Sequence, residues 1–128
     1  IVLYVAHNED GIKQLLDQLA LCSYKNLHII FGMVNDKDAN RVLSLLPKNA
    51  MYYFTKAQIP RTLNETMLHT KAEEYNLKGS AYSEVNNALK AATAKALPDD
   101  LILVCGSVFI VGEVNIQDNF NLPIFNKA

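Results

Sequence analysis

Short unbroken runs of hydrophobic residues alternate along this chain with longer stretches in which apolar positions recur at helical spacing. The clearest run is LILVC at 101–105, which has no polar break, as is typical of a strand buried on both faces of a parallel sheet. It ends at Gly106-Ser107, and an apolar stretch that predicts a helix follows at once over 108–114. Backbone N–H groups and a hydroxyl at such a helix N-terminus favour either an anion-binding site or a plain N-cap at Ser107.

The same alternation predicts an order of elements for the whole chain. We expect a strand over 1–6, a helix to about 22, a strand over 27–34, a helix over 39–46, a strand over 50–55, a helix over 62–75, a short strand over 79–82, a helix over 83–97, the strand over 101–105 and the helix over 108–114. Thr62 and Glu65 have the spacing of a capping box and are expected to open their helix. We expect 116–128 to be a loose tail, or a tail with one short extra strand.

Strands that alternate with helices of about 10–15 residues predict βαβ units. The fold class is therefore α/β, a three-layer Rossmann-like domain with a mostly parallel sheet of about five to six strands and helices on both faces. Residues 1–128 form a single domain of ordinary size. Because the chain starts inside a strand-like run, IVLYVA, without an initiator Met, we expect it to be a fragment of a longer polypeptide.

The composition excludes several classes of function. Half of the residues are apolar and the net charge is −1, so nothing indicates binding to nucleic acid or to a membrane surface. No apolar run is long enough to cross a bilayer. Cys22 and Cys105 have no metal-ligand spacing and are expected to be reduced thiols of a cytoplasmic protein. His28, within a strand, and His69, within a helix, are expected to be structural.

Polar residues that can carry chemistry follow the predicted strands. His7 and Asn8 follow the first strand, Lys37 the second, Arg61 the third and Ser107 the last long one. In a parallel sheet these positions share one edge, which is where α/β proteins bind ligands. The first turn has one glycine and no GxxxxGK[ST] occurs, so the chain has no phosphate-cradling loop with which to hydrolyse ATP by itself.

These motifs together resemble the C-terminal domain of the Mur ligase superfamily, and its folate branch of folylpolyglutamate and dihydrofolate synthases above all. AHN after a first strand, GMVNDKD after a second, PR after a third and GSVFIVGEV after a later one stand in the family's order from 3 to about 114. The resemblance implies a ligase that activates a folate or dihydropteroate carboxylate with ATP as an acyl phosphate, which the amine of L-glutamate attacks. It also implies Mg²⁺, an N-terminal domain and a central P-loop domain elsewhere in the same chain, and no tight cofactor binding or activity by this domain alone.

The resemblance also implies roles for single residues. His7 would lie at the reaction centre, Asn8 at the ATP phosphates, and Lys37, Ser107 and Arg61 at the carboxylates of glutamate. Position 4 belongs to the nucleotide site in the family, but Tyr4 stands where the family has Asp, and Glu9 where it has Pro. This departure has three alternative explanations. The affinity for the nucleotide is reduced, or another residue such as Asp10 compensates for the missing Asp, or the chain is a diverged member of the family.

Each candidate also has a structural explanation. His7 is suited to bond backbone in a turn, Lys37 to be solvated after a helix cap, and Arg61 to pair with Glu65 at helical spacing. The alternative functions are a Mur-type ligase for peptidoglycan precursors, a small α/β module that binds a ligand without catalysis, and a purely structural or oligomerising domain. Which folate acceptor is used, and whether one or two reactions are catalysed, is left open.

Overall fold

The computed structural model describes residues 2–5, 8–34, 39–58, 62–106, 110 and 125–127, the segments 2–5 and 125–127 as backbone. In chain order the elements are β1 (Val2–Val5), α1 (Glu9–Ala20), β2 (Leu27–Gly32), α2 (Ala39–Leu45), β3 (Met51–Phe54), α3 (Glu65–Glu73), β4 (Lys78–Ala81), α4 (Val85–Lys95), β5 (Leu101–Gly106) and β6 (Phe125–Lys127).

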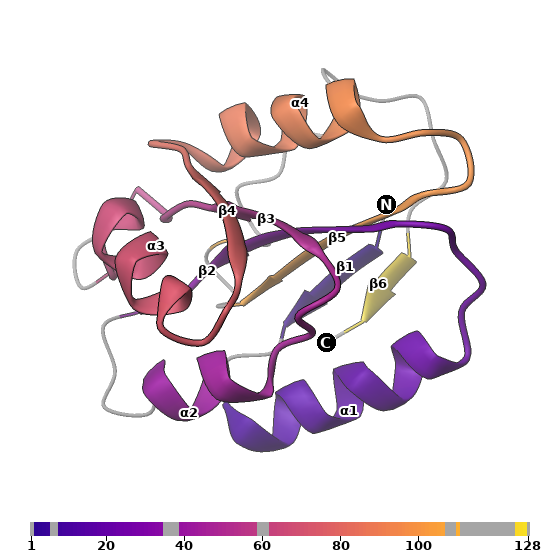
Figure 1. Ribbon diagram of the computed structural model, residues 1–128, viewed down its shortest axis with the longest axis horizontal. Helices are drawn as coiled ribbons and strands as arrows, with labels where there is room; N and C mark the ends of the chain where they lie inside the picture. The colour runs from indigo at the N-terminus through magenta and orange to yellow at the C-terminus, as the bar shows by residue number, and fades with distance from the viewer. Residues whose placement is uncertain are drawn as a thin grey trace.

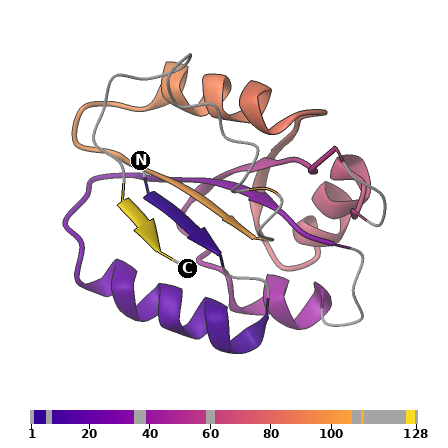
Figure 2. The ribbon, with the colours of Figure 1, turned by 180° about the vertical axis from the view of Figure 1, so that it is seen from behind.

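The six strands form one sheet in the order β4-β3-β2-β5-β1-β6, and every neighbouring pair is parallel. Helices α1 and α2 lie on one side of the sheet and α4 lies on the other (Figure 1), and the view from behind shows the same three layers (Figure 2). The predicted α/β class, with a parallel sheet between helices, is confirmed.

The core consists of two apolar layers, one on each face of the sheet. Side chains of α1, α2 and α3 pack with Ile29 and Phe31 of β2, whereas those of α4 pack with Ile30 of the same strand. Along β5, Leu103 points to the first layer and Val104 to the second, and all four side chains from 102 to 105 are buried. This double burial is the reason that the strand is an unbroken apolar run.

The predicted capping box of α3 is wrong. The residue that caps α3 is Asn64, whose side-chain oxygen accepts the backbone N–H groups of Thr66 at 2.9 Å and Met67 at 3.3 Å. Thr62 instead forms an antiparallel bridge with Val34. That bridge draws Thr62 into the extended chain before the helix, so a hydroxyl at this position cannot serve as the N-cap.

Most other predicted elements are present with shorter ends. β2 ends at Gly32 rather than at 34, α3 ends at Glu73 rather than at 75, and α4 spans Val85–Lys95. The short extra strand expected in the tail is β6. The helix expected over 108–114 lies outside the described residues except for Ile110. No helix in the described part of the chain has both the length and the apolar character to cross a membrane.

Candidate functional site

The edge of the sheet predicted to bind ligands is formed by the carboxyl ends of β1, β5 and β2. Gly106 at the end of β5 lies in register with Val5 of β1 on one side and with Gly32 of β2 on the other. The chain passes from β1 to β2 over α1 and returns through α4 on the opposite face, so β5 is inserted between the first two strands. Open α/β sheets bind ligands where the connections diverge in this way.

Two glycines bring the backbone of this edge unusually close together. Gly106 has φ +123°, and a Cβ atom there would overlap the carbonyl oxygen of Gly32. A Cβ atom on Gly32 would lie 2.6 Å from the carbonyl oxygen of Thr55 and 2.5 Å from Cδ1 of Ile110. Only glycine fits at either position, and both glycines are buried, so the two strand ends and the chain after β3 pack closely together at this edge.

Asn8 lies at the same edge, where it begins α1. Its backbone is extended and its Oδ1 atom accepts the backbone N–H of Gly11 at 2.8 Å, so Asn8 is the N-cap of the helix. The side chain is exposed, and its amide group carries two further N–H donors that the cap does not use. The predicted nucleotide-binding residue therefore combines a structural role with donors at a helix N-terminus, which favours an anionic ligand.

Arg41, which our sequence analysis did not single out, lies beside this helix start. Its Nε atom is 3.1 Å from Oε2 of Glu9, and the other oxygen of that carboxylate is 3.3 Å from Nζ of Lys13. Asn8, Glu9, Asp10 and Arg41 line a small hollow of about 210 Å³. Arg41 lies in the first turn of α2, shortly after the predicted site residue Lys37. The sequence could not show that it lies near Asn8, because that proximity arises from the packing of α2 beside α1.

The chain segments before Lys37 and after Arg61 lie side by side. Val34 and Thr62 form an antiparallel bridge, and the backbone N–H of Leu63 donates to the carbonyl oxygen of Met33 at 2.9 Å. These contacts hold the segment before Lys37 and the segment after Arg61 together at one end of the sheet.

The loop that follows β3 is anchored at the same edge. The backbone N–H of Thr55 donates to the carbonyl oxygen of Phe31 at 2.9 Å, and the side-chain amide of Gln58 donates to the carbonyl oxygen of Ser83 at 2.8 Å. Thr55 is fully buried, and its Oγ1 atom has no hydrogen-bond partner among the described residues. The loop is thus held at both of its described ends before the chain reaches Arg61.

Four of the six predicted site residues, His7, Lys37, Arg61 and Ser107, lie outside the described residues. The backbone of Tyr4 lies in β1 opposite Cys105 and Lys127. In the described ranges, no three His, Cys, Asp or Glu side chains are grouped to hold a metal ion.

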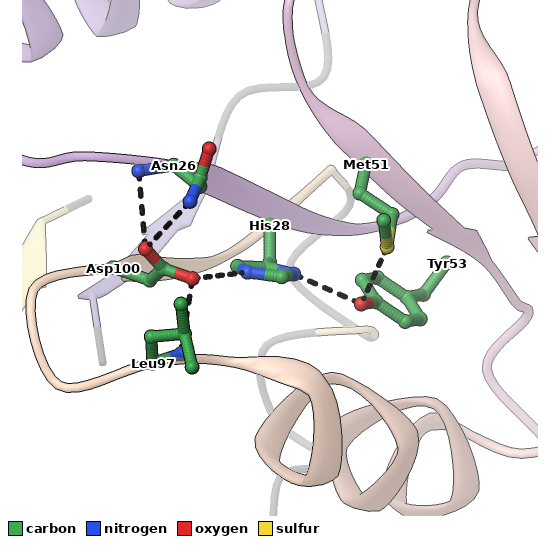
Figure 3. A network of polar contacts seen from close by, with 6 residues as sticks. All are labelled: Asn26, His28, Met51, Tyr53, Leu97 and Asp100. Carbon is green, nitrogen blue, oxygen red and sulfur yellow. Dashed lines mark hydrogen bonds and ion pairs between the residues drawn. The ribbon is translucent and has the colours of Figure 1, made fainter.

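A second polar cluster lies at the opposite, amino-terminal edge of the sheet (Figure 3). Asp100 accepts hydrogen bonds from the backbone N–H of Leu97 at 3.0 Å and from the backbone and side-chain amides of Asn26 at 3.2 and 3.1 Å. The two ring nitrogens of His28 have different partners. Nε2 lies 2.9 Å from Oδ2 of Asp100, and Nδ1 lies 2.9 Å from the hydroxyl of Tyr53. A hollow of about 640 Å³ opens beside these residues.

Protonation of this cluster follows from its contacts. The Leu97 N–H, the His28 ring and the Asn26 side chain lower the pKa of Asp100 to about 2. Burial, together with the nearby Tyr82 and Asp100, raises the pKa of Tyr53 to about 12. Near neutral pH, Asp100 is therefore a carboxylate that only accepts hydrogen bonds, and Tyr53 retains its hydroxyl proton.

The parallel sheet between helices defines a Rossmann-like α/β domain, in which the strand ends of β1, β5 and β2 form the edge predicted to bind ligands. Residues 1–108 match the family described as Mur ligase, glutamate ligase domain. The chain belongs to that family.

Three relatives show where this similarity lies. A probable bifunctional folylpolyglutamate synthase/dihydropteroate synthase of Haloferax volcanii is 36% identical over 116 residues, which are 88% of this chain and 14% of the relative. The structure of Escherichia coli FolC in complex with DHPP and ADP has a TM-score of 0.72 and 30% identity, over 84% of this chain and 25% of that one. A bifunctional folylpolyglutamate synthase/dihydrofolate synthase with Mn, AMPPNP and L-glutamate bound has a TM-score of 0.71 and 25% identity, over 84% and 26%.

The chain thus spans about one-seventh of the length of the archaeal relative and about a quarter of each solved chain.

Proposed function

We propose that this chain is the C-terminal domain of an ATP-dependent ligase that adds L-glutamate to a folate or dihydropteroate carboxylate. The observation that carries the proposal is the match of residues 1–108 to the glutamate ligase domain of Mur ligases. The similar synthases, one bound to DHPP and ADP and another to AMPPNP, Mn and L-glutamate, support the folate branch and these substrates.

The described part of the edge is suited to the phosphates of a nucleotide. Asn8 is exposed and offers amide donors at the N-terminus of α1, next to the strand ends that Gly32 and Gly106 allow to pack closely together. Glu9 and Asp10 bring negative charge to the same turn, which Arg41 and Lys13 offset. In the proposed enzyme, Asn8 contacts the phosphates, and the residue at position 4, Tyr4, flanks the nucleotide.

Lys37, Arg61 and Ser107 are proposed to bind the incoming glutamate. A dianionic amino acid requires cationic groups or N–H donors, and a lysine, an arginine and a hydroxyl at a helix start supply them. The bridge between Val34 and Thr62 supports this assignment, because it joins the segments that precede Lys37 and follow Arg61.

The proposed chemistry is amide formation at an acyl phosphate. ATP transfers its γ-phosphoryl group to the acceptor carboxylate and ADP leaves as the P–O bond breaks. The glutamate amine then attacks the acyl carbon, the C–N bond forms, the acyl C–O bond to phosphate breaks, and the amine loses a proton as phosphate leaves. His7 is proposed to lie at this centre, where a fixed donor stabilises charge on the reacting oxygens. The divalent metal, Mg²⁺ in the proposal, would be held with the nucleotide and the central domain; in the described ranges no three His, Cys, Asp or Glu side chains are grouped to hold it.

We assign this domain the role of closing over a nucleotide bound by a central domain of the same polypeptide. Closure would exclude water from the acyl phosphate and complete the site only when glutamate is present. The two thiols, Cys22 and Cys105, form no disulfide, which suits a reducing compartment such as the cytoplasm.

The test is ATP-dependent glutamate addition by the parent polypeptide, with dihydropteroate and tetrahydrofolate as acceptors. We expect Lys37→Ala and Ser107→Ala to raise the KM for glutamate by about tenfold or more, because each removes a group that binds a carboxylate. Lys48→Ala, an exposed lysine before β3, is the matched control and should leave KM unchanged.

Two results would contradict the proposal. Unchanged kinetics in both variants would remove these residues from the glutamate site. Robust ATPase activity of the 128-residue chain alone would contradict the dependence on a central domain.

A further inference from the structure

A hydrogen-bonded row runs across the amino-terminal edge of the sheet, opposite the edge predicted to bind ligands; it is buried at His28 and reaches the surface at Met51. It passes from Asp100 through His28 of β2 to Tyr53 of β3 and ends at Met51 (Figure 3). The distances are 2.9 Å from Asp100 Oδ2 to His28 Nε2, 2.9 Å from His28 Nδ1 to the Tyr53 hydroxyl and 3.2 Å from that hydroxyl to Met51 Sδ. The side chains of His28 and Asp100 are only 4% and 2% exposed.

The position of one hydrogen atom in this row is settled by its neighbours. Asp100 is a carboxylate, since its pKa is about 2, so it accepts and cannot donate. His28 must therefore carry hydrogen on Nε2 at any pH above that range. Nδ1 is therefore the ring nitrogen whose protonation can change.

The Tyr53 hydroxyl satisfies Nδ1 in both cases. When Nδ1 is bare, the hydroxyl donates its hydrogen to His28. When Nδ1 is protonated, it donates to the hydroxyl oxygen, and the hydroxyl hydrogen turns to Met51 Sδ, which is a weak acceptor at 3.2 Å. No buried nitrogen of His28 loses its partner in either state, so this row avoids the usual cost of an unpaired buried group.

We propose that His28, Tyr53 and Met51 form a two-state proton switch, in which uptake of one proton on His28 Nδ1 turns the Tyr53 hydroxyl from His28 to Met51. One proton enters from solvent, no covalent bond breaks and no proton leaves. The states differ at the surface, because Met51 is 44% exposed and lines the hollow beside the network. In the protonated state the hydroxyl fixes Met51, and in the neutral state it releases that side chain.

The charged and titratable groups around the row bias the switch in opposite directions. Asp100, directly before β5, favours the proton on His28. Lys95 of α4, whose Nζ lies 5.8 Å from the centre of the Tyr53 ring, and Lys78 of β4, which lines the same hollow, disfavour it. Tyr82 also faces the row, with its ring 5.9 Å from that of Tyr53.

The experiment is a pH titration of the ¹⁵N-labelled chain in which two-bond ¹H–¹⁵N spectra report the protons on each histidine ring. We expect His28 to carry hydrogen on Nε2 at high pH and on both nitrogens at low pH. In Met51→Leu, protonation would leave the Tyr53 hydroxyl unpaired, so the midpoint of the His28 titration should fall by about one pH unit, a tenfold loss of proton affinity. His69, which pairs with Glu73 on α3, is the reference that should not move.

Met51→Gln restores an acceptor of similar reach and separates the switch from simple packing. Its midpoint should return to the wild-type value or exceed it, because an amide oxygen accepts better than a thioether. Equal midpoints in the wild type and Met51→Leu would overturn the proposal. So would a neutral His28 with its hydrogen on Nδ1, or a fall in Met51→Gln equal to that in Met51→Leu.

Discussion

Gly106 and Gly32 face each other in register at the ends of β5 and β2, with no room for a side chain on Gly106 in front of the Gly32 carbonyl. The contact is made possible by the φ of +123° at Gly106, a conformation that residues with a Cβ atom rarely adopt. It brings two adjacent strand ends together at the edge of the sheet that the sequence predicts to bind ligands. The pair thus allows the two buried strand ends to pack closely against each other.

Gly106→Ala should destabilise the domain by about 2 kcal/mol or more, because it adds backbone strain and a collision with Gly32. Urea unfolding followed by circular dichroism measures this. Gly11→Ala, within α1, is the control and should leave stability unchanged or raise it by up to about 1 kcal/mol. Equal stability of Gly106→Ala and the wild type would show that the turn relaxes to another conformation.

Asn64→Ala should cost about 1 kcal/mol, because it removes the oxygen that accepts the first N–H groups of α3. Asn64→Asp retains that oxygen and should be close to the wild type in thermal unfolding. If Asn64→Ala and Asn64→Asp unfold at the same temperature, the capping contact contributes nothing measurable.

The sheet could be predicted from the sequence because its central strands are buried on both faces. That burial requires apolar side chains at successive positions, which is visible in 101–105 without any knowledge of the partner strands. The polar edge of the sheet followed from the same reasoning, since parallel strands end together. Asn8 lies at that edge, and its contact with a nucleotide stays a prediction.

The caps and polar networks could not be predicted in this way. Thr62 and Asn64 both suit an N-cap, and the choice between them depends on the pairing of Thr62 with the distant Val34. His28 and Asp100 are 72 residues apart, and neither has a local pattern that indicates the other. Their contact arises only when β5 is inserted beside β2.

Asp100 should make the stability of the domain depend on pH in the acid range. Its folded-state pKa of about 2 is lower than the ordinary value of 3.8, so the unfolded chain takes up a proton first as the pH falls. The contribution of Asp100 to the free energy of unfolding should therefore be fully present above about pH 5 and decrease progressively towards pH 2.

Asp100→Asn should lower stability at neutral pH and flatten this acid dependence, as measured by urea midpoints at a series of pH values. Asp99→Asn, which changes an exposed neighbour, should retain the slope of the wild type. An unchanged slope in Asp100→Asn would mean that other carboxyl groups cause the acid sensitivity.

Two substitutions at Asn8 separate its structural role from its proposed role at the phosphates. Asn8→Ala removes the cap of α1 and should cost about 1 kcal/mol in thermal or urea unfolding of the domain. Asn8→Asp keeps the capping oxygen and adds a charge that the helix N-terminus favours, so stability should be equal to or above that of the wild type. In the parent enzyme the same charge would repel the nucleotide, and the KM for ATP should rise severalfold. A stable Asn8→Asp enzyme with the wild-type KM for ATP would confine Asn8 to capping and leave the phosphates to other residues of the edge.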